Sequence, residues 1–72
     1  MPYVNIKVTD TGVTSEQKKA LIKGVTDLLQ TVLDKDPAKT FVVIDEVNMD
    51  NWGVAGEQTS QRLAREKSGL AQ

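Results

Sequence analysis

The second residue of the chain, Pro2, is the first whose type could carry chemistry. It heads the segment MPYVNIKV, in which Val4, Ile6 and Val8 alternate with polar residues at the period of a β-strand. Proline donates no backbone hydrogen bond, and the first position of a strand tolerates it for that structural reason alone. If processing removes Met1, Pro2 instead presents a free secondary amine. An α-amino group titrates near ~8 and burial lowers its pKa, so this amine could act as a base near neutral pH.

Two adjacent carboxylates, Asp45 and Glu46, are the other residues that could be taken for an acid–base pair. They end the second apolar run of the chain, and neighbouring residues of a strand point to opposite faces. We therefore interpret them as surface charges at the end of a strand. The chain has no cysteine and no histidine, which excludes disulfides and argues against a conventional zinc site. The sequence predicts neither a metal nor a cofactor.

A helix that could position such groups is predicted from about Ser15 to Leu33. Thr14 and Gln17 have the spacing of a capping box at its start. Apolar residues then recur at spacings of one and three and form a single stripe, made of Leu21, Ile22, Val25, Leu28, Leu29, Val32 and Leu33. The helix is expected to end before Pro37, because the residue before a proline avoids the α region.

The segment Thr40–Ile44 is nearly continuous in apolar residues and predicts a second strand, buried on both faces. Strand, helix and strand at this length predict a β-α-β unit with parallel strands. We expect Leu28 and Leu29 to face the sheet, and Gly24 is a candidate for close packing of the helix on it. One helix cannot cover both faces of two strands, so the missing cover must come from another copy of the chain.

The remainder of the chain gives weaker patterns. Residues 48–56 indicate a turn or a short C-terminal hairpin, in which Gly53 and Gly56 are expected to hold special backbone geometry. Residues 58–72 carry many charges and little periodicity, and residues 68–72 are expected to be a frayed tail. We expect a single domain over residues 1–72.

Composition limits the classes of partner. The 72 residues carry a net charge of −1 without a basic stripe, which argues against nucleic acid as a partner. No apolar run approaches the ~18 residues of a membrane span, so we expect no membrane partner and a cytoplasmic protein. A core this small rarely contributes more than about 3–5 kcal/mol, which favours oligomerisation.

Three features together resemble the 4-oxalocrotonate tautomerase family. They are the proline directly after Met1, the SEQK stretch at the start of the helix, and DNWGVAGE after the second strand. The resemblance covers roughly residues 2 to 62. It implies β-α-β subunits of the α/β (α+β) class whose sheets pair into dimers, commonly three to a hexamer. It also implies keto–enol tautomerisation, in which the amino-terminal proline removes a proton next to a carbonyl and returns it elsewhere.

The resemblance assigns Trp52 to the position of an aromatic residue that lies against the proline. There it would form an apolar wall and exclude water. Aromatic residues are also common anchors of subunit interfaces, and both roles can hold together.

The best-known members of the family also carry two arginines that bind substrate carboxylates. Here the matching positions are Gly12 or Val13 and Phe41, none of which is charged. Loss of one such group commonly costs ~10²–10³ in rate, so a dicarboxylate substrate is in doubt. Lys39, or Arg62 or Arg65 of the tail, could substitute, although exposed Lys and Arg are usually only solvated charges.

The sequence thus predicts a homohexameric, tautomerase-like isomerase (a trimer of dimers) that acts on a small enol or 2-oxo acid. Pro2 is the expected general base and acid, and Trp52, Phe41, Arg62 and Lys39 are the expected substrate-binding residues. The alternative is a non-catalytic or weakly active oligomeric module that binds small molecules with the same fold.

Overall fold

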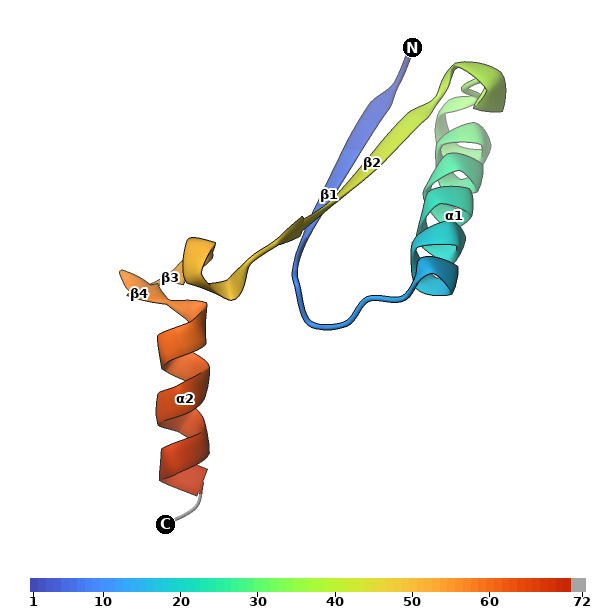
Figure 1. Cartoon of the computed structure of the whole chain (residues 1–72). Helices are drawn as coiled ribbons and strands as arrows, with labels where there is room; N and C mark the ends of the chain where they lie inside the picture. The colour runs from blue at the N-terminus through green and yellow to red at the C-terminus, as the bar shows by residue number, and fades with distance from the viewer. Residues whose placement is uncertain (71–72) are drawn as a thin grey trace.

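A computed structural model describes the backbone of residues 1–70 and the side chains of residues 1–66. A β-α-β unit comprises β1 (Tyr3–Thr9), α1 (Ser15–Leu33) and β2 (Phe41–Val47) (Figure 1). The two strands are parallel and in register from the pair Tyr3 and Phe41 to the pair Thr9 and Val47. The predicted fold class and strand order are confirmed.

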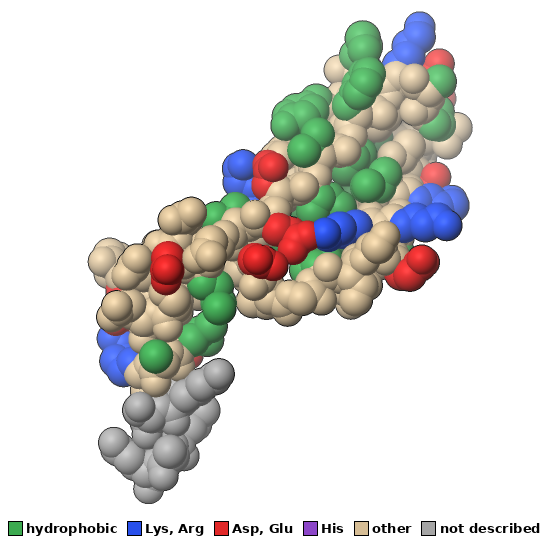
Figure 2. Space-filling view, in the orientation of Figure 1, with side chains coloured by type: hydrophobic (Ala, Val, Ile, Leu, Met, Phe, Trp, Pro, Cys, Tyr) green, Lys and Arg blue, Asp and Glu red, His purple; other side chains and the backbone are tan. Residues whose placement is uncertain are grey.

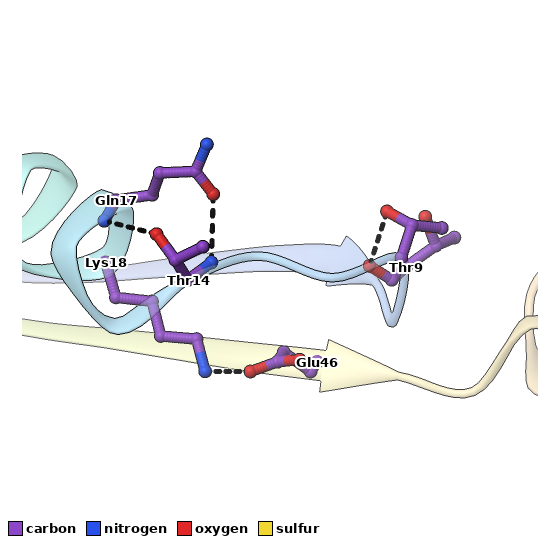
Figure 3. A network of polar contacts seen from close by, with 6 residues as sticks. Thr9, Thr14, Gln17, Lys18 and Glu46 are labelled. Carbon is purple, nitrogen blue, oxygen red and sulfur yellow. Dashed lines mark hydrogen bonds and ion pairs between the residues drawn. The ribbon is translucent and has the colours of Figure 1, made fainter.

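The helix α1 begins and ends at the residues expected from the sequence. The Thr14 hydroxyl accepts a hydrogen bond from the Gln17 backbone N–H at 3.1 Å, and the Gln17 side chain accepts one from the Thr14 N–H at 2.9 Å (Figure 3). Both bonds satisfy N–H groups that the first turn would otherwise leave unpaired. Asp34 ends the helix with a left-handed backbone (φ 55°). A 3-10 turn, η1 (Pro37–Lys39), then leads into β2.

Two packing expectations for α1 are wrong within one chain. Leu29 is half-buried, but Leu28 is 60% exposed and does not face the sheet. Gly24 has no atom within 4 Å of the position that a Cβ would take, so it does not mark close helix packing. A helix over only two strands makes a narrow contact, and much of its apolar stripe extends beyond that contact.

The two faces of the sheet differ in their cover. The ion pair between Lys18 of α1 and Glu46 of β2 places α1 on the face that Glu46 shares, by alternation, with Val42 and Ile44. The opposite face, which we call the open face, is formed by Tyr3, Asn5, Lys7 and Thr9 of β1 and Phe41, Val43, Asp45 and Val47 of β2. Tyr3 is 63% exposed, Phe41 50% and Val43 42%. The expected burial of β2 on both faces is therefore not met within a single chain, and hydrophobic side chains reach the surface (Figure 2).

The chain continues past β2 as an arm that extends away from the β-α-β unit (Figure 1). The arm comprises η2 (Met49–Asn51), β3 (Gly53–Val54), β4 (Glu57–Gln58) and α2 (Thr59–Leu70). The antiparallel β3–β4 pair confirms the predicted hairpin. Gly56 has the expected special geometry (φ 81°), but Gly53 does not have a positive φ.

The helix α2 was not predicted from the sequence. The Ser60 hydroxyl in its first turn donates a hydrogen bond to the Asp50 side chain. Arg65 in its middle forms an ion pair with Glu57 at 2.8 Å. These contacts compensate for a weak apolar pattern. The expected fraying of residues 68–72 remains a prediction, because the helical backbone reaches Leu70 and residues 71–72 lie outside the described part.

The molecule as a whole is elongated and lacks a core. None of the side chains described, up to Glu66, is fully buried. The chain extends over 51 × 25 × 18 Å with a radius of gyration of 16.5 Å, whereas a compact domain of this length has about 11 Å. Both observations support the expectation that other copies complete the sheet. Within residues 1–70, no helix is long and apolar enough to span a membrane.

Candidate active site

Pro2 lies just before the amino end of β1, where it is half-buried. Its carbonyl accepts a hydrogen bond from the Phe41 N–H at 3.0 Å, which extends the ladder of the parallel pair by one bond. This bond fixes the backbone of Pro2 beside the first residue of β2. Met1 is 83% exposed, so the bond that links it to Pro2 lies at an accessible chain end.

Phe41 is the expected substrate-binding residue whose backbone is hydrogen-bonded to Pro2. Its strand partner is Tyr3, and the two aromatic side chains share the open face at the amino end of both strands. The position expected from the resemblance to carry an arginine therefore has an apolar, half-exposed ring. Tyr3 was not among the predicted site residues, although its aromatic type directly after Pro2 was a visible signal.

Lys39 also lies at the Pro2 end of the sheet, because η1 immediately precedes β2. Lys39 is two residues before Phe41 and would share its strand face if the strand began before Lys39. That condition is not met, since Lys39 belongs to a 3-10 turn and β2 begins at Phe41. Strand alternation therefore says nothing about the direction of its side chain.

Trp52 and Arg62 lie at the other end of the molecule, in the arm. The Thr59 N–H donates to the Trp52 carbonyl at 2.7 Å, and Arg62 pairs with Glu66 on α2 at 3.1 Å. Pro2 and Trp52 are thus separated by the full length of the strands, about 20 Å for seven residues. One chain does not bring its own proline and tryptophan together.

The two carboxylates of β2 do point to opposite faces, as expected, but both are engaged. Asp45 accepts hydrogen bonds from the Asn5 amide at 2.7 Å and from the Lys7 ammonium at 3.0 Å. These two bonds, with the positive charge of Lys7, hold the pKa of Asp45 below its usual value. The interpretation as simple surface charges missed this contact, which follows from the in-register pairing of β1 with β2.

Glu46 joins the start of α1 to the carboxyl end of β2 (Figure 3). Lys18, one turn into the helix, forms the ion pair, and the hydrogen bond that it donates lowers the pKa of Glu46. Glu46 therefore fixes the helix start relative to the sheet.

A hollow on the described part of the surface lies away from Pro2. An apolar hollow on α1 is lined by Val13, Gln17, Ala20 and Leu21. It includes Val13, one of the positions where the resemblance would put an arginine, but not Pro2. Among the described residues, no three His, Cys, Asp or Glu side chains are grouped as metal ligands would be.

Comparisons with known proteins agree with this architecture. The family model described as "Tautomerase enzyme" matches residues 2–62. Probable tautomerase K2 of Dickeya dadantii is 60% identical over 62 residues, which cover 86% of this chain and 92% of the relative. The 2-hydroxymuconate tautomerase of Bacillus subtilis is 37% identical over 60 residues, or 83% of this chain and 95% of the relative.

A solved structure extends the agreement to the fold. A structure from work on the 4-oxalocrotonate tautomerase isozymes of Methylibium petroleiphilum superimposes with a TM-score of 0.84 at 26% identity. The match covers 89% of this chain and 98% of the other. The β-α-β subunit with an extended arm is thus the architecture that this chain shares with tautomerases. The chain belongs to the tautomerase family, and the predicted resemblance is confirmed.

Proposed function

We propose that the chain, once Met1 is removed, is a keto–enol tautomerase in which Pro2 is the general base and acid. The observation that carries the proposal is the placement of Pro2, half-buried and hydrogen-bonded to Phe41 at the first position of the family match. The free amine takes the hydroxyl proton of an enol, and the resulting prolinium returns a proton to the substrate carbon. No metal or cofactor is required for this transfer.

The active site is shared between subunits. Pro2 and Phe41 lie at one end of the sheet and Trp52 at the other, so a neighbouring copy supplies Trp52 as the apolar wall. Arg62 is in the same arm as Trp52 and would arrive with it as a cation for the substrate carboxylate. An assembly that closes these sites and covers the open face is required, and we propose a homohexamer.

The substrate is an enol or 2-oxo acid with one carboxylate and an apolar remainder. Phe41 lies next to Pro2, and its ring offers no partner to a second carboxylate, where an unpaired charge would be costly to bury. The Bacillus subtilis relative is named for 2-hydroxymuconate, a diacid. That compound is accordingly the appropriate comparison substrate.

Ketonisation of phenylpyruvate enol and of 2-hydroxymuconate tests the proposal with three proteins. They are the processed chain, the same chain with Met1 retained, and Pro2→Ala. Retention of Met1 converts the Pro2 nitrogen into a tertiary amide without basicity, and it leaves every side chain in place. We expect activity only in the processed protein, with a preference for phenylpyruvate enol. Equal rates in all three would remove Pro2 from the mechanism, and preference for the diacid would reject the proposed substrate class.

A second candidate function is an oligomeric module that binds such acids without turning them over efficiently. The apolar Phe41, at a position where an arginine would stabilise the enolate, favours it. Binding of phenylpyruvate to processed protein with no ketonisation above the Met1-retaining form would select this alternative. A cytoplasmic location remains the expectation from the sequence.

A further inference from the structure

The single tyrosine of the chain, Tyr3, directly follows Pro2 and begins β1. Its strand partner is Phe41, whose N–H donates to the Pro2 carbonyl at 3.0 Å. In-register partners point to the same side of a sheet, so Tyr3 and Phe41 hold neighbouring positions on the open face. Tyr3 therefore lies beside the position at which the chain has a phenylalanine where an arginine was expected.

The Tyr3 hydroxyl is open to a ligand. Tyr3 is 63% exposed, and its hydroxyl makes no hydrogen bond with the residues that the structure describes. A phenol can donate one hydrogen bond and accept others. Further along β1 on the same face, Asn5 and Lys7 both donate to Asp45, at 2.7 Å and 3.0 Å. Tyr3 thus carries the side-chain donor of the open face that lies nearest to Pro2.

The proposed reaction develops negative charge on one substrate oxygen. When the Pro2 amine takes the enol hydroxyl proton, the electron pair of the broken O–H bond stays on that oxygen as an enolate. The prolinium then gives its proton to the carbon of the double bond, which supplies the electron pair, and a ketone remains. A donor placed where such charge develops stabilises the transition state. The Phe41 ring cannot supply one.

We propose that Tyr3 is a second catalytic residue, whose hydroxyl donates a hydrogen bond to the enolate oxygen in place of the absent arginine. Tyr3 keeps its own proton throughout, so Pro2 alone carries the proton that is transferred. The inference rests on the proposed function, because it assigns a role within that reaction. It adds a residue that neither the sequence pattern nor the resemblance assigned to the site.

Tyr3→Phe tests the role because it removes the hydroxyl and keeps the ring. The enolate charge develops only after the substrate has bound. We therefore expect kcat for phenylpyruvate enol to fall about 100-fold, while KM changes by less than about 3-fold.

Two further variants separate this role from other causes. Thr9→Val removes a hydroxyl from the far end of the same face and should leave both constants unchanged. Lys39→Met removes the cation of the turn before β2, which is the rival donor at the Pro2 end. A loss of kcat that is larger in Lys39→Met than in Tyr3→Phe would assign the role to Lys39 and overturn the inference.

A binding measurement tests the contact without turnover. Because the chain has one tyrosine, ¹³C label on the ring carbon that bears the hydroxyl gives one NMR signal. Phenylpyruvate has the oxygen that Tyr3 would contact, and hydrocinnamate has the same ring and carboxylate without it. We expect phenylpyruvate to shift the signal of the processed protein clearly more than hydrocinnamate does.

The outcomes distinguish the contact from the chemistry. An unchanged kcat in Tyr3→Phe, a rise in KM alone, or equal NMR shifts from the two ligands would overturn the inference and leave the role of Pro2 standing. An unmodified, processed chain that shows the phenylpyruvate-specific shift but does not ketonise the enol would reject the proposed function and support the contact. No ketonisation and no specific shift would reject both.

Discussion

At the scale of single residues, Ala55 is unusual because it holds a left-handed backbone without being a glycine. Its φ is 53°, and that of the following Gly56 is 81°. Positive φ at both central residues is the requirement of a two-residue type I′ hairpin turn, which connects β3 to β4 here. Asparagine is the residue most favoured before glycine in this turn, whereas alanine is strained by its Cβ.

Ala55→Asn is therefore expected to stabilise the protein by about 0.5–1 kcal/mol, because asparagine tolerates the left-handed region that alanine resists. Chemical denaturation at fixed protein concentration measures the change. Ala38→Asn is a suitable control, because Ala38 lies in η1 and has no positive φ. An unchanged or lowered midpoint for Ala55→Asn would mean that the turn is not strained.

The two carboxylates of β2, Asp45 and Glu46, should make the stability of the fold depend on pH. The folded-state pKa values of Asp45 and Glu46 are both lowered, first by hydrogen bonds from Asn5 and Lys18 respectively. A lowered folded pKa contributes stability that is present above the unfolded pKa, near about 4, and is lost as the pH falls through the folded value. We expect unfolding free energy to be constant near neutrality and to decline below about pH 4.

Asp45→Asn removes one of these titrations and should make the acid decline shallower. Urea unfolding between neutral pH and strong acid, at one protein concentration, checks this expectation. Equal slopes for the two proteins would contradict the assignment of the decline to Asp45.

Some residue-scale features were open to prediction and others were not. Pro2 was visible as a candidate base because its chemistry depends only on its place in the chain. The engagement of Asp45 was missed, because it depends on the register of two strands that lie about forty residues apart in the chain. The expected special geometry of Gly53 was wrong, since composition marks a turn but does not say which of its glycines takes the positive φ.

At the scale of elements, α1 shows how local chemistry sets a boundary. The capping box of Thr14 and Gln17 satisfies two N–H groups without any tertiary contact. The boundaries of α1 were therefore predictable from the sequence. The helix α2 was not predictable in this way. Contacts with η2 and β4, made by Ser60 and Arg65, hold it in place, and such contacts leave no periodic pattern in the sequence.

Thr14→Ala should cost about 0.5–2 kcal/mol, since it leaves the Gln17 N–H without its acceptor. Thr11→Ala is a matched control on the preceding loop, where the hydroxyl makes only a long 3.4 Å contact with the Thr9 carbonyl. Surface changes of that kind stay within about 0.5 kcal/mol. Equal losses for both variants, measured by chemical denaturation, would show that the capping bonds carry no special weight.

At the scale of the whole molecule, the chain has the features expected of one subunit of an oligomer. The β-α-β unit leaves one sheet face open and the arm reaches away from it (Figure 1). The need for other copies was predicted from chain length and from the apolar second strand. The separation of Pro2 from Trp52 at opposite ends of one chain was not predicted, because spacing along the sequence does not say how far apart two residues lie in space.

That separation makes a prediction about mixed oligomers. Pro2→Ala and Trp52→Ala should each be nearly inactive alone, since every site then lacks either its base or its apolar wall. If Pro2 and Trp52 of one site come from different copies, oligomers that are dissociated, mixed in equal amounts and reassembled will contain sites with both residues intact. Random assembly gives about a quarter of all sites in that state, so about a quarter of the unmodified activity should return. Mixing without dissociation is the control and should return none. If both residues of a site came from the same chain, no chain in the mixture would carry both, and activity would stay absent after reassembly.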